Sequence, residues 1–211
     1  MDIHLKEKMS ENMEIVIPKI SREKIDLFES YYDEISRWKM KMNLTSLHGW
    51  ELVRKLFIES LLFSKLFNPI SKICILDIGT GAGFPGLPLK IVFNDIKLHL
   101  IEKDRKKISF LENLTARLKL NDITLHKTRI EEFISNIDYP DHFNLILSRA
   151  ISLPESVISK FCSLLKDDGL YIRKQCSEPG DKLKFKTIKL DNPWNKNDPY
   201  FYEAIGVDEL K

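Results

Sequence analysis

A glycine- and proline-rich turn at the end of an apolar run constrains this chain more than any other feature. The segment LDIGTGAGFPGLP covers residues 76–88 and begins like a buried strand. Gly79, Gly81 and Gly83 then remove three β-carbons from a tight turn, so the backbone can take positive φ angles and approach another molecule closely. Pro85 can start a helix without losing a hydrogen bond. The segment therefore predicts a strand, a ligand-binding turn and a helix, in that order.

The chain beyond residue 69 alternates between strand-like and helix-like segments. Strands are predicted at residues 72–78, 97–102, 123–130, 143–150 and 170–175, and helices near residues 86–93, 105–119, 131–136 and 154–166. Such alternation implies parallel strands joined by right-handed crossovers. Two further β-like segments, residues 183–190 and 200–206, have no helix between them and predict an antiparallel hairpin at one edge. We expect an α/β fold with a mostly parallel, seven-stranded sheet.

The patterning divides the chain into three parts. Residues 1–20 carry few apolar anchors and are expected to form a flexible leader. Residues 21–68 show two apolar stripes at helical spacing, the first beginning with Ser21 as a helix cap, and predict an N-terminal helical extension packed on the core. Residues 69–211 hold the alternating pattern and are expected to be the ligand-binding core.

Composition limits the cellular compartments and the kinds of binding partner that can be expected for this chain. Lysine and arginine total 33 against 31 aspartate and glutamate, so a net charge of +2 cannot by itself supply affinity for nucleic acid. The three cysteines, Cys74, Cys162 and Cys176, lack the spacing of metal ligands, which predicts no metal site and a reducing compartment. The charged beginning and the lack of a long apolar run predict a cytoplasmic protein that does not enter the membrane. Nothing in the sequence demands a dimer, and we expect a monomer.

The spacing of the glycines selects among ligands. A dinucleotide-binding turn, G-x-G-x-x-G, would place its third glycine at position 84, where this chain has Phe84. The spacing D-x-G-x-G-x-G, with Asp77 two residues before Gly79, is instead similar to motif I of class I S-adenosylmethionine (AdoMet) methyltransferases. AdoMet has no pyrophosphate, but it has a methionine ammonium that a carboxylate would favour. Glu102, which closes the next predicted strand, lies where such enzymes hold the two ribose hydroxyls.

The sequence also limits the methyl acceptor. Enzymes that methylate exocyclic amines of adenine or cytosine usually carry an N-P-P-Y-like tetrapeptide after the fourth strand, where this chain has LSRAISLPE. Methylation of pyrimidine C5 needs a nucleophilic cysteine in a polar loop. Cys74 falls in a predicted buried strand and Cys162 in a predicted helix, so only Cys176 is left open. A ring nitrogen such as guanine N7 has a free lone pair, and a site without an obvious general base suits that reaction.

Basic residues are expected at the ligand-binding edge of the sheet. They are Lys106, Lys107, Arg129, Arg149, Arg173 and Lys174, with Arg37, Lys39, Lys41, Arg54 and Lys55 on the N-terminal helices. Gathered around one cleft, they would hold phosphates with an affinity that falls as the salt concentration rises. Any single lysine is more often solvated. Arg149, flanked by small residues at the mouth of a strand, is favoured as functional.

Several stretches together resemble the bacterial ribosomal RNA small subunit methyltransferase G family, also called glucose-inhibited division protein B. Between Tyr31 and Gln175 they are NLTS, LVRKLFIESL, LDIGTGAGFPGLPLKI, KKISFL, TRIEEF and LSRA. The resemblance implies a class I AdoMet-dependent methyltransferase (Rossmann-like) fold. It also implies methylation of a guanine at N7 in 16S ribosomal RNA, in a hairpin loop near the decoding centre. The partner would be 16S rRNA, the small ribosomal subunit or an assembly intermediate.

The resemblance and motif I together imply roles for individual residues. AdoMet would be held by Asp77, Gly79, Gly81, Phe84, Glu102, Ile130, Glu131 and Arg149. Within this set, Ile130 and Glu131 would bracket the adenine. Arg149 would also border the incoming guanine, which makes it the candidate catalytic residue.

Other positions carry weaker expectations. Asn43, Arg54 and Lys174 would shape the rRNA side of the site. Lys55 and Glu59 stand where members of the family typically have His and Asp, so their roles are open. Two alternatives to the proposed activity remain. A class I methyltransferase with another RNA or protein acceptor would bind AdoMet but leave the 16S N7 site unmodified, whereas a non-catalytic RNA-binding or ribosome-assembly module would bind RNA without AdoMet.

Overall fold

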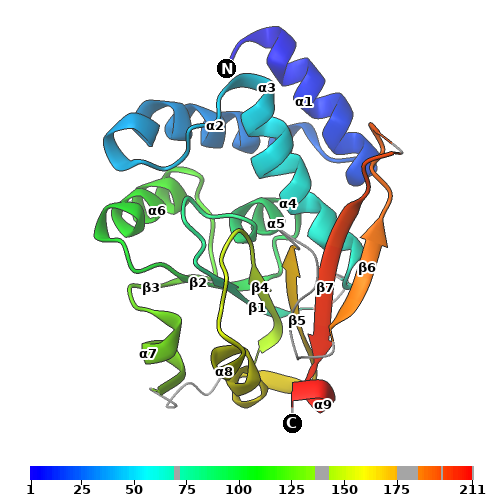
Figure 1. Ribbon diagram of the computed structural model, residues 1–211. Helices are drawn as coiled ribbons and strands as arrows, with labels where there is room; N and C mark the ends of the chain where they lie inside the picture. The colour runs from blue at the N-terminus through cyan, green and yellow to red at the C-terminus, as the bar shows by residue number, and fades with distance from the viewer. Residues whose placement is uncertain (69–71, 136–142, 175–184, 196, 211) are drawn as a thin grey trace.

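A mixed β-sheet forms the centre of the protein (Figure 1). The computed structural model describes residues 1–68, 72–135, 143–174, 185–195 and 197–210, and these form one seven-stranded sheet in the order β3-β2-β1-β4-β5-β7-β6. The strands are β1 (Cys74–Ile78), β2 (Lys97–Ile101), β3 (Ile123–His126), β4 (Phe143–Ser148), β5 (Leu165–Lys174), β6 (Lys186–Leu190) and β7 (Tyr200–Gly206). β1 to β5 pair in parallel, and β7 runs antiparallel to both β5 and β6. The predicted sheet with its antiparallel edge hairpin is confirmed.

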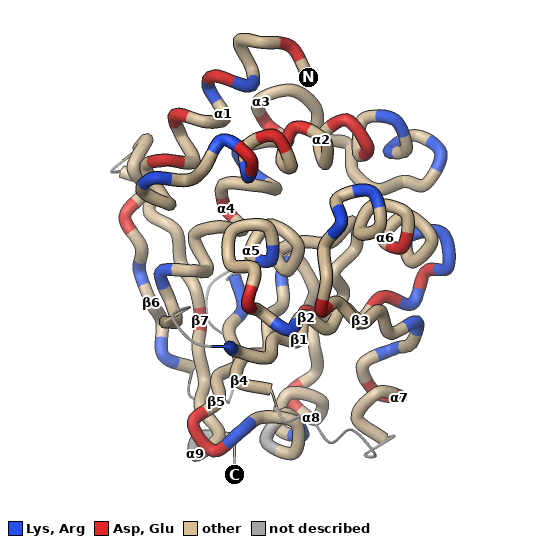
Figure 2. The backbone as a smooth tube through the Cα atoms, turned by 180° about the vertical axis from the view of Figure 1, so that it is seen from behind, with Lys and Arg blue, Asp and Glu red and all other residues tan. Residues whose placement is uncertain are grey.

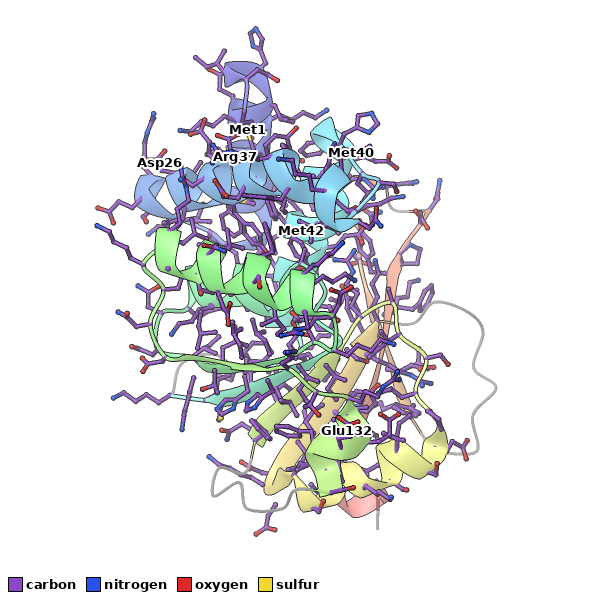
Figure 3. The ribbon with its side chains drawn as sticks, turned by 90° about the vertical axis from the view of Figure 1, so that its left-hand side faces the viewer. Met1, Asp26, Arg37, Met40, Met42 and Glu132 are labelled. Atoms are coloured by element: carbon purple, nitrogen blue, oxygen red, sulfur yellow. The ribbon has the colours of Figure 1, made fainter. Side chains whose placement is uncertain are left out.

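Helices cover both faces of the sheet (Figures 1 and 3). One face carries α1 (Ile3–Val16), α2 (Arg22–Met42), α5 (Gly86–Val92) and α6 (Arg105–Arg117), and the other carries α7 (Ile130–Ser135), α8 (Glu155–Ile158), η3 (Ser159–Ser163) and α9 (Val207–Leu210). All five residues of β1 are buried because both faces are covered. Alternate residues of β1 enter opposite cores, so Ile75 packs with the first group and Leu76 with the second. In the described ranges, no helix combines the length and apolar character needed to cross a bilayer.

The beginning of the chain packs against the core, which corrects the expectation of a flexible leader. The Asp2 carboxylate caps α1 by accepting from the Leu5 amide at 2.9 Å. Met9, Met13 and Val16 are at most 1% exposed. Their spacing of four and three residues places them on one face of the helix. The segment is highly charged overall, so its short apolar stripe was not recognised from the composition. This stripe packs the helix against the core.

The second predicted N-terminal helix is a run of four short helical pieces. α3 (Gly49–Leu52), η1 (Val53–Ile58), α4 (Glu59–Leu61) and η2 (Leu62–Lys65) follow one another without a break. η1 is π-helical, and the Glu59 amide donates to the Arg54 carbonyl five residues earlier. Such turns inside α-helices often lie at functional sites. The first helix, by contrast, is a regular α2 that begins after the predicted cap, Ser21.

Candidate functional site

The glycine turn lies where β1 ends, at the carboxyl edge of the parallel strands. Gly79, Gly81 and Gly83 have φ angles of +67°, +62° and +102°, which residues with a β-carbon rarely adopt. A β-carbon on Gly83 would also lie 2.4 Å from a side-chain atom of Leu87 and 2.6 Å from the Tyr31 hydroxyl. The tight turn predicted from the sequence is therefore confirmed, and at position 83 both the backbone angle and the packing require glycine.

Asp77 anchors the turn and keeps one oxygen unpaired. Its buried Oδ2 accepts from the Thr80 hydroxyl at 2.7 Å and from the Gly86 amide at 2.9 Å. Its Oδ1 is buried without a hydrogen-bond partner among the described residues. Burial raises the pKa of Asp77 to about 7, although the two hydrogen bonds favour the charged form. A buried acceptor left unsatisfied in this way would gain from a nearby cation or donor.

Glu102 connects the turn to the end of β2. Its Oε2 accepts from the Gly81 amide at 3.0 Å, and its Oε1 accepts from the Asp104 amide at 2.9 Å. These two bonds orient the carboxylate and leave acceptor capacity on both oxygens. Because the side chain also lines the cleft beside the turn, it can accept hydrogen bonds from a ligand there.

A cleft of about 330 Å³ opens beside the turn, over the carboxyl ends of β1, β2 and β3. Four of the predicted cofactor residues, Gly79, Glu102, Ile130 and Glu131, line this cleft together. One wall of the cleft comes from the segment after β4, where Ile151 lies 3.1 Å from the place that a β-carbon on Gly79 would take. The cleft thus combines bare backbone, a carboxylate acceptor and apolar side chains, which suits a ligand with an apolar ring and a hydroxylated sugar.

The ring of Phe84 packs away from this cleft. It stacks on Tyr31 with ring centroids 5.3 Å apart and planes within 3° of parallel, and it lies 5.7 Å from Phe57. The Tyr31 hydroxyl donates to the Ala82 carbonyl at 2.5 Å. Phe84 therefore ties the turn to α2 and η1, and neither its ring nor Asp77 is among the residues that line the cleft.

Arg149 follows β4 directly and lies next to the glycine turn. Ser148 pairs with Ile78 across the sheet, so the residues that follow them, Arg149 and Gly79, leave neighbouring strands at the same level. The Arg149 guanidinium donates to the Lys55 carbonyl and, at 3.3 Å, to the Ser60 hydroxyl. This side chain therefore joins the sheet edge to the N-terminal helical segment.

The basic residues do not gather around one cleft, contrary to expectation. Lys107 and Arg129 line the cleft, whereas Arg54 and Lys174 contact Glu59. Other lysines and arginines lie along α6 and toward the carboxyl end of α2 (Figure 2). Asn43, expected on the rRNA side, ends α2 in a left-handed conformation with φ +49°. The cationic surface is thus divided between the cleft, the surroundings of Glu59 and the helices.

Sequence reasoning missed several residues that the fold brings to the cleft. They are Lys103, Thr128, Ile151, Ser152 and Leu153. Each follows the carboxyl end of a parallel strand, which is where ligands bind in open α/β sheets. That rule could have identified all of them once the strands were assigned.

The structure describes the side chain of one of the three cysteines. Cys74 is buried in β1, as expected. Cys176 and the side chain of Cys162 lie outside the described part of the structure. No group of three or more His, Cys, Asp or Glu side chains is placed to hold a metal ion in that part.

Comparison with known sequences identifies relatives that match most of this chain. The family model described as rRNA small subunit methyltransferase G matches residues 24–191. Relatives named ribosomal RNA small subunit methyltransferase G include one from Mycoplasma capricolum, 38% identical over 182 residues that cover 86% of this chain and 74% of the relative. Another, from Dictyoglomus thermophilum, is 37% identical over 169 residues, covering 80% of this chain and 69% of the relative.

Solved structures share the fold at low sequence identity. A mutant of MtNAS in complex with S-adenosylmethionine superposes with a TM-score of 0.58 at 12% identity, covering 97% of this chain and 80% of that one. Coclaurine N-methyltransferase bound to N-methylheliamine and SAH superposes with a TM-score of 0.51 at 12% identity, covering 82% of this chain and 57% of that one. These similarities concern the architecture of sheet and helices.

Proposed function

Because this chain belongs to the ribosomal RNA small subunit methyltransferase G family, we propose that it transfers a methyl group from AdoMet to N7 of a guanine in 16S ribosomal RNA. The observation that carries the proposal is the cleft at the ends of β1, β2 and β3, where the glycine turn, a carboxylate and apolar walls meet. The target guanine is proposed to lie in the hairpin loop near the decoding centre. The proposed substrate favours a cytoplasmic enzyme, with rRNA or a small-subunit particle as its partner.

The residues around the cleft fit AdoMet. Glu102 offers oriented carboxylate oxygens to the ribose hydroxyls, and Ile130 with Glu131 offers an apolar contact and an acceptor for the adenine. Gly79 has no side chain, so a ligand can approach its backbone, and a β-carbon there would lie 3.1 Å from Ile151. The unpartnered Oδ1 of Asp77 adds a buried acceptor whose charge would favour the methionine ammonium.

The acceptor base is assigned to the half of the sheet edge beyond the cleft, over β4 and β5. AdoMet supplies a methyl group on a positively charged sulfur, which is open to in-line attack by a nitrogen lone pair. Guanine N7 carries such a lone pair, so the protein need only orient the base and exclude water. Arg149 lies at the boundary between the two halves, where its guanidinium can donate to guanine O6 and leave N7 free.

The test is methyl transfer from labelled AdoMet to deproteinised 16S rRNA and to small-subunit particles, both from cells that lack the enzyme. Cleavage of the strand at N7-methylated guanine then locates the modified nucleotide. A single new cleavage in the decoding-region loop is the expected result. The better of the two substrates identifies the form of rRNA that the enzyme recognises.

Other outcomes select the alternatives. Label incorporated without N7 cleavage would retain the cofactor and replace the acceptor by another RNA or protein group. RNA binding that is sensitive to salt, without AdoMet affinity or methyl transfer, would indicate a ribosome-assembly module.

A further inference from the structure

Four charged side chains from three parts of the chain, Arg149 among them, meet at Glu59. The Glu59 carboxylate receives Arg54 Nη1 at 3.1 Å on Oε1, and Arg149 Nη2 at 3.4 Å on Oε2. Lys174 Nζ, at the end of β5, donates to the same Oε2. Glu59 is therefore shared by three cations that belong to η1, the loop after β4, and β5.

The π-helical turn is the reason that Arg54 and Glu59 can meet. In a regular α-helix, residues five apart point roughly 140° away from one another. In η1 the hydrogen bonds span five residues, so Glu59 comes to lie one turn above Arg54. The π-helical turn thus places the Glu59 carboxylate against Arg54. The same carboxylate also contacts Arg149 after β4 and Lys174 at the end of β5.

The same helical segment supplies three acceptors for Arg149. They are the Lys55 carbonyl, the Ser60 hydroxyl and Glu59 Oε2. Glu59 is the charged member of this set, and charge-assisted bonds are about twice as strong as neutral ones. Its backbone carbonyl also accepts from the Tyr202 hydroxyl at 3.3 Å, which fixes the position of the helix against β7. Glu59 consequently adds a charged contact to the two neutral ones that orient Arg149.

The cluster brings three cations to one carboxylate in a partly buried place. Three cations face one carboxylate, and Arg54, Lys174 and Arg149 retain 31%, 20% and 13% of their side-chain exposure, against 5% for Glu59. The carboxylate is thus sheltered, while the cations keep access to the surface. Cations in such an arrangement can bind phosphates. The buried carboxylate offsets the repulsion among the cations and holds them in place.

We infer that Glu59 is a positioning residue for methyl transfer, which holds Arg149 toward the acceptor base and keeps Arg54 and Lys174 beside it to receive rRNA phosphates. This inference rests on the proposed function, because it assigns the acceptor to the β4–β5 half of the edge. Glu59 itself does not take up a proton from guanine, since N7 has none to give. Its effect passes through the geometry of Arg149.

The test replaces the carboxylate by an amide of the same shape, Glu59→Gln. Without the negative charge the three cations repel one another, and Arg149 loses its charged acceptor. The single-turnover rate at saturating AdoMet and rRNA should fall by about tenfold to a hundredfold, while the dissociation constant for AdoMet stays within about twofold. Affinity for rRNA should be retained or increased, and its salt dependence should steepen by roughly 0.7 to 0.9, because one positive charge has been uncovered.

Glu203→Gln is the matched control. Glu203 is also a buried carboxylate paired with an arginine of β5, Arg173, at 2.5 Å, but no contact described for it involves Arg149. This variant should be destabilised to a similar extent and yet keep its transfer rate within about twofold. Equal rate losses in the two variants, or a Glu59→Gln loss that is matched by weaker AdoMet binding, would mean that Glu59 only stabilises the fold.

Glu59→Asp keeps the charge and should recover most of the rate. An Asp variant as slow as the Gln variant, or a Gln variant with the wild-type rate, would overturn the inference. Failure of the wild-type chain to methylate 16S rRNA would instead contradict the proposed function, so the two failures are distinguishable.

Discussion

At the scale of single residues, the buried carboxyl group of Asp77 makes stability depend on pH. Burial raises its pKa to about 7, so between about pH 4 and pH 7 the folded chain holds a proton that the unfolded chain has lost. The free energy of unfolding therefore falls as the pH rises through this window, and then levels off. We expect Asp77→Asn to remove this fall, as measured by urea denaturation at several pH values. The same slope in both proteins would show that another group titrates.

Asp26 on α2 provides a control of opposite sign (Figure 3). Its hydrogen-bonded ion pair with Lys6, at 2.7 Å, lowers the pKa of this carboxyl group. Its contribution to stability is therefore present above its unfolded pKa and is lost as the pH falls through the folded one. Asp26→Asn should leave the slope between about pH 4 and pH 7 unchanged.

Glu102 supplies the carboxylate that lines the cofactor cleft beside the glycine turn in the proposed site. Glu102→Gln keeps the size of the side chain but gives up one acceptor and the charge, so AdoMet affinity should fall by about tenfold, as measured by calorimetry. The exposed Glu112 on α6 offers a control, and Glu112→Gln should bind AdoMet as the wild type does. Unchanged affinity in Glu102→Gln would remove this residue from the ribose site.

At the scale of elements, α2 holds the glycine turn through one side chain. Tyr31 stacks on Phe84 and donates to the Ala82 carbonyl. Tyr31→Phe keeps the ring but leaves that buried carbonyl without this donor, which should lower the free energy of unfolding by about 1–3 kcal/mol and weaken AdoMet binding. The half-buried neighbour Tyr32 is the control, since Tyr32→Phe removes a hydroxyl outside this contact. Equal losses of stability and AdoMet affinity in the two variants would show that the Tyr31 hydroxyl of α2 does not support the glycine turn.

At the scale of the whole molecule, the N-terminal helices and one face of the sheet share a core. One cluster of buried side chains extends from Met9 in α1 to Ala204 in β7. The chain should consequently unfold in a single transition, in which circular dichroism and tryptophan fluorescence change together. Met13→Ala should lower the free energy of unfolding by about 2–5 kcal/mol. Met40, which is 82% exposed on α2 (Figure 3), is the control, and separate transitions for α1 and the sheet would contradict a shared core.

Much of the fold and part of the site could be predicted because their signals are local. Alternating apolar periods identified the strands and most helices, and the glycine spacing identified the turn that follows β1. Glu102 could be placed at the cleft from its position at the end of a strand. The ring of Phe84 could not be placed in the same way, because its direction depends on Tyr31, more than fifty residues earlier in the chain.

The sequence by itself determined the order of strands and helices, the antiparallel hairpin and the bare turn at the end of β1, because these follow from neighbouring residues and their backbone preferences. Only the tertiary structure decided that α1 packs into the core and that the Glu59 carboxylate pairs with three cations. Lys174 lies 115 residues from Glu59 in the chain. A local sequence pattern cannot predict a contact between residues so far apart in the sequence. That contact exists because the parallel sheet brings the ends of β4 and β5 together and the π-helical turn directs Glu59 toward them.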